Sequence, residues 1–235
     1  MKDYIFHLLF VWYPYICLTV FLLGSLIRFD REPYTWKASS SQILRKRQLR
    51  WGSNLFHVGI LFLLLGHTVG LLTPTSLYTL VMSVELKQLV AVTAGGIAGV
   101  MCFVGLSLLL HRRLFDERIR RTSSAMDIAI LALLWLQLVL GLATLPFSLG
   151  HRDGSVMLIL SHWAQGIVTL HPVDAKTLQG LDWPYLVHLV LGMTLFLVFP
   201  FSRLVHIWSA PVWYLGRRGY QVVRSRGPLP ARGRP

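Results

Sequence analysis

The chain has 235 residues, of which 54% are hydrophobic and 14% are charged, and its formal net charge is +13. This composition excludes an ordinary soluble domain, in which about a quarter of the residues are charged. Most of the Lys and Arg residues lie in segments between long uncharged runs, which argues against a nucleic-acid-binding surface. We therefore predict a membrane protein without a nucleic-acid partner.

Five runs without Asp, Glu, Lys or Arg are each long enough to cross about 30 Å of hydrocarbon as an α-helix. They cover Tyr4–Ile27, Gly52–Thr73, Gln88–Leu110, Ile128–Leu149 and Trp183–Ser202. We predict an all-α membrane protein in which residues 1–220 form one bundle of five transmembrane helices. The remaining residues, 221–235, form a basic tail rich in Pro, Gly and Arg that we expect to be disordered.

The placement of basic residues predicts the orientation of these helices. Segments 28–50, 111–127 and 203–235 hold seven, five and seven Lys or Arg residues, whereas the N-terminal tail, 74–87 and 150–182 hold one, one and two. This alternation is the positive-inside pattern, so it predicts an outer N-terminus and a cytoplasmic C-terminus. The first run lacks a small-residue cleavage site and is predicted to be an uncleaved helix rather than a signal peptide.

The long segment between the fourth and fifth runs contains the stretch VMLILSHWAQGIVTL, residues 156–170. Its pattern predicts an amphipathic helix lying on the membrane surface. Five of the nine histidines are not predicted to bind a metal, because they lie in this segment or near the ends of the runs: His7, His111, His151, His162 and His171.

The other four histidines lie in or just after two of the runs, where polar side chains need a partner or a function. The predicted topology places His67 and His188 near the outer face and His57 and His206 near the cytoplasm. On straight helices, His57 and His67 would be about 15 Å apart along the axis of the second helix. His188 and His206 would be about 27 Å apart along the fifth helix and would share one face of it. These separations disagree, although Pro200 can bend or unwind the fifth helix.

Bis-histidine ligation of haem is the interpretation that we favour, because imidazole from facing helices is a common axial ligand. The absence of CxxCH excludes covalent c-type attachment, and Cys17 and Cys102 are isolated residues typical of apolar packing. Glycines such as Gly66 beside His67 allow a porphyrin or a helix to approach closely. Hydrogen bonds from each histidine to a neighbouring helix are the alternative.

Several stretches resemble the gamma subunit of respiratory nitrate reductase, a dihaem membrane cytochrome b. They are WYPYICLTVFLLGSLIRFD, YTWKASSSQ, SNLFHVGILFLLLGH, HRRLF and HLVLGMTLFLVFPFSRLVHIWSAPVWYL. The resemblance extends from about Tyr13 to Tyr220. It implies two non-covalent b haems, an outer (distal) one on His67 and His188 and a cytoplasmic-side (proximal) one on His57 and His206.

The resemblance also implies a mechanism and partners. A membrane quinol, menaquinol or ubiquinol, is oxidised near the outer haem, and its protons leave on the outer side. Electrons pass through both haems to a cytoplasmic iron–sulfur (beta) subunit and then to a molybdenum (alpha) subunit that reduces nitrate. The expected setting is the lipid of a bacterial or archaeal inner membrane, with roles in anaerobic respiration, proton motive force and nitrate assimilation.

Two further groups of residues are candidates for the site. Lys87, just before the third run, matches the family's quinol pocket, and Gly66 lies in the same neighbourhood. A cation there could hydrogen-bond a quinol oxygen; an interfacial lysine is the alternative reading. Arg112 and Arg203 at the inner boundary are candidates for haem propionate contacts, although positive-inside residues would also occupy these positions.

Other functions remain open at this stage. A related dihaem quinol-oxidising subunit, such as that of a sulfite-reduction complex, would keep the haems but serve a different catalytic partner. A transporter with a histidine proton relay is a second alternative, although such folds commonly show internal repeats and the sequence has none. A membrane anchor without cofactor is the third.

Overall fold

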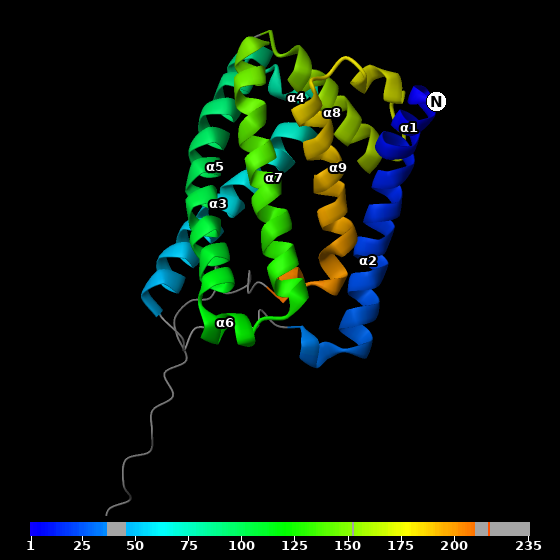
Figure 1. Ribbon diagram of the computed structural model, residues 1–235. Coiled ribbons are helices and arrows are strands. Elements are labelled where there is room, and N and C mark those ends of the chain that lie inside the picture. Colours follow the sequence, from blue (N-terminus) through cyan, green and yellow to red (C-terminus); the bar gives the residue numbers. More distant parts are fainter. Residues whose placement is uncertain (37–45, 152, 210–215, 217–235) are drawn as a thin grey trace, which may run out of the picture.

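The computed structural model describes residues 1–36, 46–151, 153–209 and Gly216, and this part of the chain is helical and contains no strand (Figure 1). The predicted disordered tail, 221–235, lies outside the described residues. The α-helices are α1 (Lys2–His7), α2 (Tyr13–Arg31), α3 (Lys46–Leu72), α4 (Thr75–Tyr78), α5 (Val84–Phe115), α6 (Glu117–Arg121), α7 (Ala125–Gly150), α8 (Ser155–Val168) and α9 (Trp183–Val198). Shorter 3-10 and π segments are η1 (Leu8–Trp12), η2 (Pro33–Thr35), η3 (Ala175–Leu178), η4 (Phe199–Phe201) and η5 (Arg203–Ser209).

Five helices are long and apolar enough to cross a membrane, which confirms the predicted fold class. They cover Lys2–Arg31, Arg47–Leu72, Val84–Phe115, Ala125–Gly150 and Trp183–Phe201. Four of them extend beyond the uncharged run that predicts them, because polar side chains at their ends continue the helix into the region where water can reach it. The five spans make up most of the described residues.

Short polar side chains explain where several helices begin. The Ser83 side chain accepts a hydrogen bond from the backbone of Leu86 at the start of α5. Ser124 and Asp127 form a reciprocal capping box at the start of α7. Each of these contacts satisfies backbone N–H groups that have no partner within the first turn of a helix. These caps therefore fix the residues at which α5 and α7 begin.

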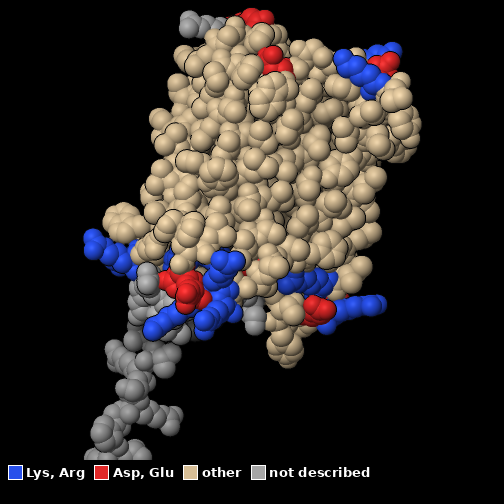
Figure 2. All heavy atoms as spheres, in the orientation of Figure 1, with Lys and Arg blue, Asp and Glu red and all other residues tan. Residues whose placement is uncertain are grey.

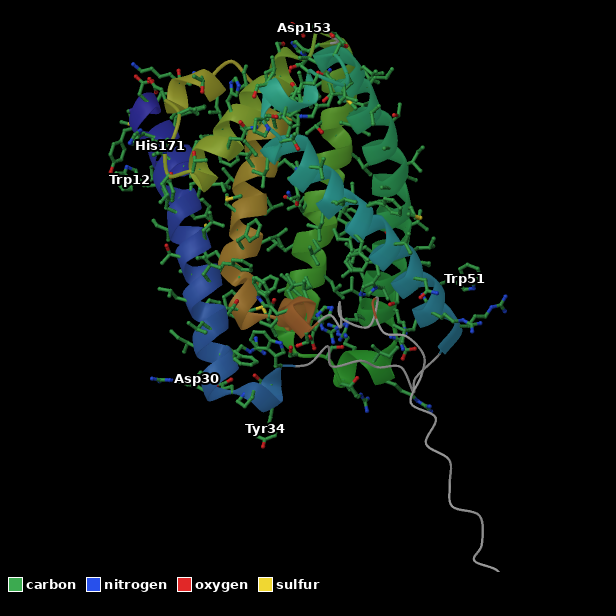
Figure 3. The ribbon with its side chains drawn as sticks, turned by 180° about the vertical axis from the view of Figure 1, so that it is seen from behind. Trp12, Asp30, Tyr34, Trp51, Asp153 and His171 are labelled. Carbon is green, nitrogen blue, oxygen red and sulfur yellow. The ribbon has the colours of Figure 1, made fainter. Side chains whose placement is uncertain are left out.

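The spans form a bundle in which α3 runs obliquely across the others (Figures 1 and 3). It packs against α5, which packs against α7, while α9 packs between α7 and α2. Glycine makes the first of these contacts possible: a Cβ at Gly59 would lie 2.7 Å from Cys102 Cβ, and one at Gly105 would meet the backbone nitrogen of Phe56. Small residues thus bring α3 and α5 into backbone contact, and Cys102 is buried between them, as an apolar packing residue would be.

The amphipathic helix that the sequence predicts in residues 156–170 is found as α8, and its apolar face packs against protein. One face of α8 packs into a buried core made of Phe10, Val156, Trp163, Ile167, Leu178, Leu181 and Tyr185. Trp163 Nε1 donates a 2.8 Å hydrogen bond to the carbonyl of Phe10. That carbonyl lies four residues before Pro14, which has no N–H to offer it. An amphipathic pattern does not distinguish burial against protein from burial in lipid, because both bury the apolar face.

Charged side chains concentrate at the ends of the bundle, and the band between the ends shows none in the view of Figure 2. Lys and Arg gather at the end formed by α6, the C-terminus of α2 and the N-terminus of α3, which we call the basic end. Asp30, Tyr34 and Trp51 lie there, whereas Trp12 and His171 lie towards the opposite end (Figure 3). Exposed Trp residues at both ends are typical of the two membrane interfaces.

Candidate functional site

Two pairs of histidines face each other between α3 and the segment formed by α9 and η5. The ring centroids of His67 in α3 and His188 in α9 are 6.3 Å apart, with an angle of 37° between the ring planes. Those of His57 in α3 and His206 in η5 are 6.4 Å apart, at 67°. We call the first the opposite-end pair and the second the basic-end pair. They are the pairs that depth along the predicted helices indicates.

The expectation that His188 and His206 share one face of a continuous helix is wrong. The α-helix α9 ends at Val198, and Phe199–Phe201 form a single 3-10 turn around Pro200. Pro200 lacks an N–H and disfavours continuation of the helix, so the unwinding expected at this residue is found. His206 follows on the separate 3-10 segment η5. The break removes the disagreement in spacing, because His206 is no longer tied to the axis of α9.

Three of the four rings are hydrogen-bonded through Nδ1 to a backbone carbonyl. His57 donates to Ser53 at 2.7 Å, His67 to Leu63 at 2.7 Å and His206 to Arg203 at 2.6 Å. A carbonyl only accepts, so Nδ1 carries the proton and the lone pair of the neutral ring is on Nε2. A hydrogen bond from the second ring nitrogen in this way sets the tautomer and the ring orientation of many metal-binding histidines.

His188 is oriented by α7 instead of by its own helix. Its Nε2 lies 3.3 Å from the amide nitrogen of Gln137, which also donates to the His188 carbonyl at 3.1 Å. The ring rests on Gly141, where a Cβ would lie 3.0 Å from His188 Cε1. In the described part of the chain, His188 Nδ1 is buried without a hydrogen-bond partner. Sequence reasoning missed both α7 residues, although a lone Gln in the run LLWLQLVLG is a visible sign.

These residues fit haem in two respects. Two imidazoles that bind one metal through bonds of about 2 Å have ring centroids about 6 Å apart, which matches both pairs. Helices α3 and α9 make little contact with each other, and no described atom lies within 4 Å of a Cβ built at Gly66 or Gly70, so there is room for a flat group between them.

The predicted propionate contacts have different surroundings. Arg112 is almost fully buried at the basic end of α5. Arg203 Nε lies 3.2 Å from a carboxylate oxygen of Asp127, and Arg113 Nη1 lies 3.6 Å from the other oxygen. Burial and the neighbouring Arg113 lower the pKa of Arg203, and Asp127 opposes that shift. Arg113 and Arg203 around the single carboxylate of Asp127 keep an excess of positive charge, which suits an anionic group.

The predicted quinol residues lie at the opposite end. Lys87 is buried, its Nζ is 3.6 Å from the ring centroid of Tyr78, and Nζ has no hydrogen-bond partner among the described residues. Gly66, beside His67, faces open space. The cation–π contact holds the ammonium group while leaving its N–H donors available to a ligand. Tyr78, which sequence reasoning missed, follows the second span and belongs to the short helix α4.

A family model described as nitrate reductase gamma subunit matches residues 6–226. Respiratory nitrate reductase 1 gamma chain and respiratory nitrate reductase 2 gamma chain, both from Escherichia coli (strain K12), are each 53% identical over 214 residues, covering 91% of this chain and 95% and 94% of those proteins. Nitrate reductase gamma chain from Bacillus subtilis (strain 168) is 38% identical over 214 residues, with 91% and 95% of the two chains covered.

The names of these relatives correct one expectation. Both proteins from Escherichia coli are named as respiratory enzymes. That naming is at odds with the predicted role in nitrate assimilation, which we replace by respiratory electron transport. The resemblance seen in the sequence motifs is confirmed by the family match across nearly the whole chain.

Proposed function

We propose that this chain, which belongs to the nitrate reductase gamma subunit family, oxidises quinol near the outer face of the membrane and delivers the electrons to cytoplasmic partners. The chain is the membrane-embedded subunit of a respiratory nitrate reductase. Two non-covalent b haems connect the two faces. The partners are the iron–sulfur subunit and the molybdenum subunit, and the latter reduces nitrate.

The observation that carries this proposal is the presence of two histidine pairs at different depths between the same two parts of the bundle. Their ring centroids are 6.3 Å and 6.4 Å apart. A haem bound by such a pair supplies one-electron transfer. Backbone carbonyls hold Nδ1 of three of the imidazoles, so the other ring nitrogen, Nε2, is the one directed away from that bond and available to a metal.

Lys87 is the residue that we assign to the quinol. Oxidation of a quinol to a quinone releases two electrons and two protons, and the quinol oxygen becomes more negative as its proton leaves. The buried ammonium group, held against the Tyr78 ring, can donate a hydrogen bond to that oxygen. Glu85 at the start of the same helix is exposed to solvent and can pass a released proton to the outer side.

The charge distribution supports the orientation. The basic end carries α6, Arg28 and Arg203 and corresponds to the cytoplasmic side by the positive-inside rule. The basic-end pair is then the proximal site, next to the iron–sulfur subunit, and the opposite-end pair with Lys87 lies at the outer face. Electrons move inward and protons are released outward, so turnover contributes to the proton motive force.

The test is a spectroscopic turnover experiment on the solubilised three-subunit complex. Added quinol should reduce the b haems, so that the absorption bands of reduced haem appear. Nitrate added afterwards should reoxidise the haems, and these bands should disappear. Replacing nitrate by chloride controls for slow oxidation by air. Haem bands that do not respond to quinol in a complex that still reduces nitrate with an artificial donor would overturn the quinol-oxidising role.

A further inference from the structure

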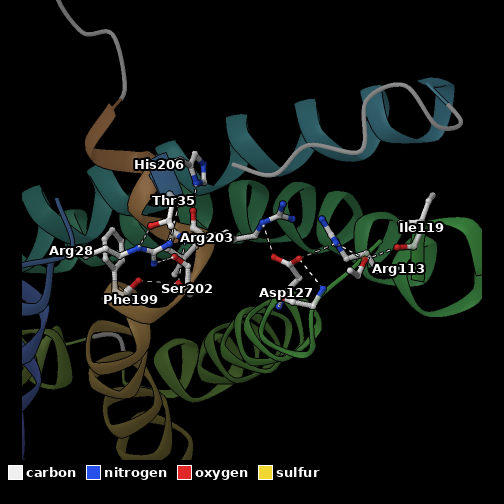
Figure 4. Close-up of polar contacts among 12 residues, drawn as sticks. Arg28, Thr35, Arg113, Ile119, Asp127, Phe199, Ser202, Arg203 and His206 are labelled. Atoms are coloured by element: carbon white, nitrogen blue, oxygen red, sulfur yellow. Dashed lines mark hydrogen bonds and ion pairs between the residues drawn. The ribbon is translucent and has the colours of Figure 1, made fainter. Parts of the chain in front are cut away.

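We infer that Asp127 is a positioning residue for the proximal haem, because it anchors the segment that presents His206 after the helix break. The inference rests on the proposed haem-binding function and assigns a role to a carboxylate that does not contact the imidazole. Figure 4 shows the residues concerned at the basic end, with Asp127 between Arg203 and Arg113. Arg28, Arg203 and Arg113 connect the break at Pro200 to Asp127.

The first step is the loss of helical hydrogen bonds at Pro200. Backbone carbonyls around the break no longer have partners within a continuous helix. Arg28, near the C-terminus of α2, donates from Nη1 to the carbonyl of Pro200 at 2.6 Å and to that of Ser202 at 2.8 Å. A guanidinium from another helix therefore fixes the start of η5.

The second step connects η5 to α7. Arg203 is the first residue of η5, and its Nε lies 3.2 Å from the Asp127 carboxylate. The two side chains are 15% and 14% exposed, respectively. The carbonyl of Arg203 accepts the 2.6 Å hydrogen bond from His206 Nδ1. One residue thus binds the carboxylate by its side chain and orients the imidazole by its backbone. Displacement of Arg203 would turn the ring of His206.

The third step is the rigidity of Asp127 itself. Its carboxylate accepts a 3.2 Å hydrogen bond from the backbone of Ser124 in the capping box of α7. The Arg113 guanidinium lies 3.6 Å from the same oxygen and donates a 2.6 Å hydrogen bond to Ser123. Contacts from the N-cap of α7 and from Arg113 of α5 therefore hold the carboxylate in the position where it binds Arg203. Without its charge, Arg113 and Arg203 would repel each other at this end of the bundle.

The experiment measures the low-spin haem signals of the solubilised complex by electron paramagnetic resonance. His206→Leu identifies the proximal signal as the one that it removes. Asp127→Asn should change the shape of that signal and lower proximal haem affinity by about 10- to 100-fold, with the distal signal as in the wild type. Asp127→Glu keeps the charge and should restore much of the wild-type signal. Glu117→Gln is the matched control, because its side chain is 88% exposed and forms an ion pair with the exposed Arg121.

The outcomes separate this inference from the proposed function. A wild-type complex without haem would overturn both. Two haems in the wild type, with a proximal signal that Asp127→Asn leaves unchanged, would overturn the inference alone. If Asp127→Asn loses both haems through misfolding, Arg203→Lys decides: a changed proximal signal supports the positioning role, and an unchanged one overturns it.

Discussion

The two histidine pairs reach nearly the same ring separation, 6.3 Å and 6.4 Å, with different supporting structures. The opposite-end pair lies on two regular helices and is surrounded by an amide and a glycine of α7. The basic-end pair joins a helix to a 3-10 segment that two arginines and a carboxylate hold in place. Close contact with α7 supports the opposite-end pair, which we also call the packing-controlled site. Charged side chains support the basic-end pair, which we also call the charge-controlled site.

This difference follows from the geometry of the spans. Two straight helices cannot place both pairs, because the predicted axial separations are about 27 Å on one helix and about 15 Å on the other. A break at Pro200 frees His206 from the axis of α9. The break exposes carbonyls, and membrane-facing ends tolerate irregular backbone only where other groups satisfy it. Charged side chains supply those groups at the basic end.

The largest expected effects come from removing one imidazole of each pair. His188→Leu should reduce the haem content of the chain from two to one and lower quinol-dependent nitrate reduction by about 100-fold or more, because a haem loses an axial ligand. His206→Leu should do the same through the other haem. Haem content and quinol-dependent rates measure both effects.

An artificial donor that reaches the cytoplasmic subunits directly provides the control for these variants. Nitrate reduction with that donor should stay near the wild-type rate in His188→Leu. Loss of both activities in a complex of normal subunit composition would contradict a role limited to supplying electrons, and the comparison between the two sites would then lose its basis.

Lys87→Met tests whether the opposite end carries the quinol chemistry. Both haems should remain, while quinol oxidation falls by about 10- to 100-fold, since a buried donor to the reacting oxygen is lost. Steady-state rates with a soluble quinol measure the change. Lys176→Met is the matched control, because Lys176 is an exposed lysine of the 3-10 segment η3. Equal rates in Lys87→Met and in the wild type would place the quinol elsewhere.

Gly141→Ala tests the packing-controlled site. The added methyl would lie 3.0 Å from His188 Cε1, so the ring must shift by a few tenths of an ångström. We expect distal haem affinity to fall by about 10-fold and only the distal signal to change. Gly150→Ala, on the same helix with nothing within 4 Å, is the matched control. A change confined to the proximal signal would contradict the assignment of Gly141 to the distal site.

Arg28→Gln tests the charge-controlled site through the thermal stability of haem binding. Two hydrogen bonds from a charged donor to the carbonyls of Pro200 and Ser202 are lost. Loss of one such bond costs about 2 kcal/mol, so proximal haem should be released at a lower temperature while the distal haem is unaffected. Absorbance during heating measures the release. The exposed Arg31→Gln should behave as the wild type, and equal shifts in both variants would rule out a specific contact.

Hydropathy and the positions of basic residues predicted the five spans, because a bilayer imposes its thickness and its charge asymmetry on any sequence that crosses it. The pairing of histidines by depth follows from the same constraint. The contacts of α8 with the protein core were not predicted, since periodicity does not reveal whether protein or lipid covers an apolar face. The contacts of Asp127 with Arg203 and of Gln137 with His188 join residues 76 and 51 positions apart. Such contacts depend on helix packing, which local sequence patterns do not encode.

The most direct measurement is the amount of haem in the purified chain, determined by the pyridine haemochrome method together with a reduced-minus-oxidised spectrum. The paired histidines predict two b-type haems per chain. A well-folded chain that contains no haem, although it was produced with haem available, would contradict the central claim. One haem per chain would show that only one of the two pairs binds it.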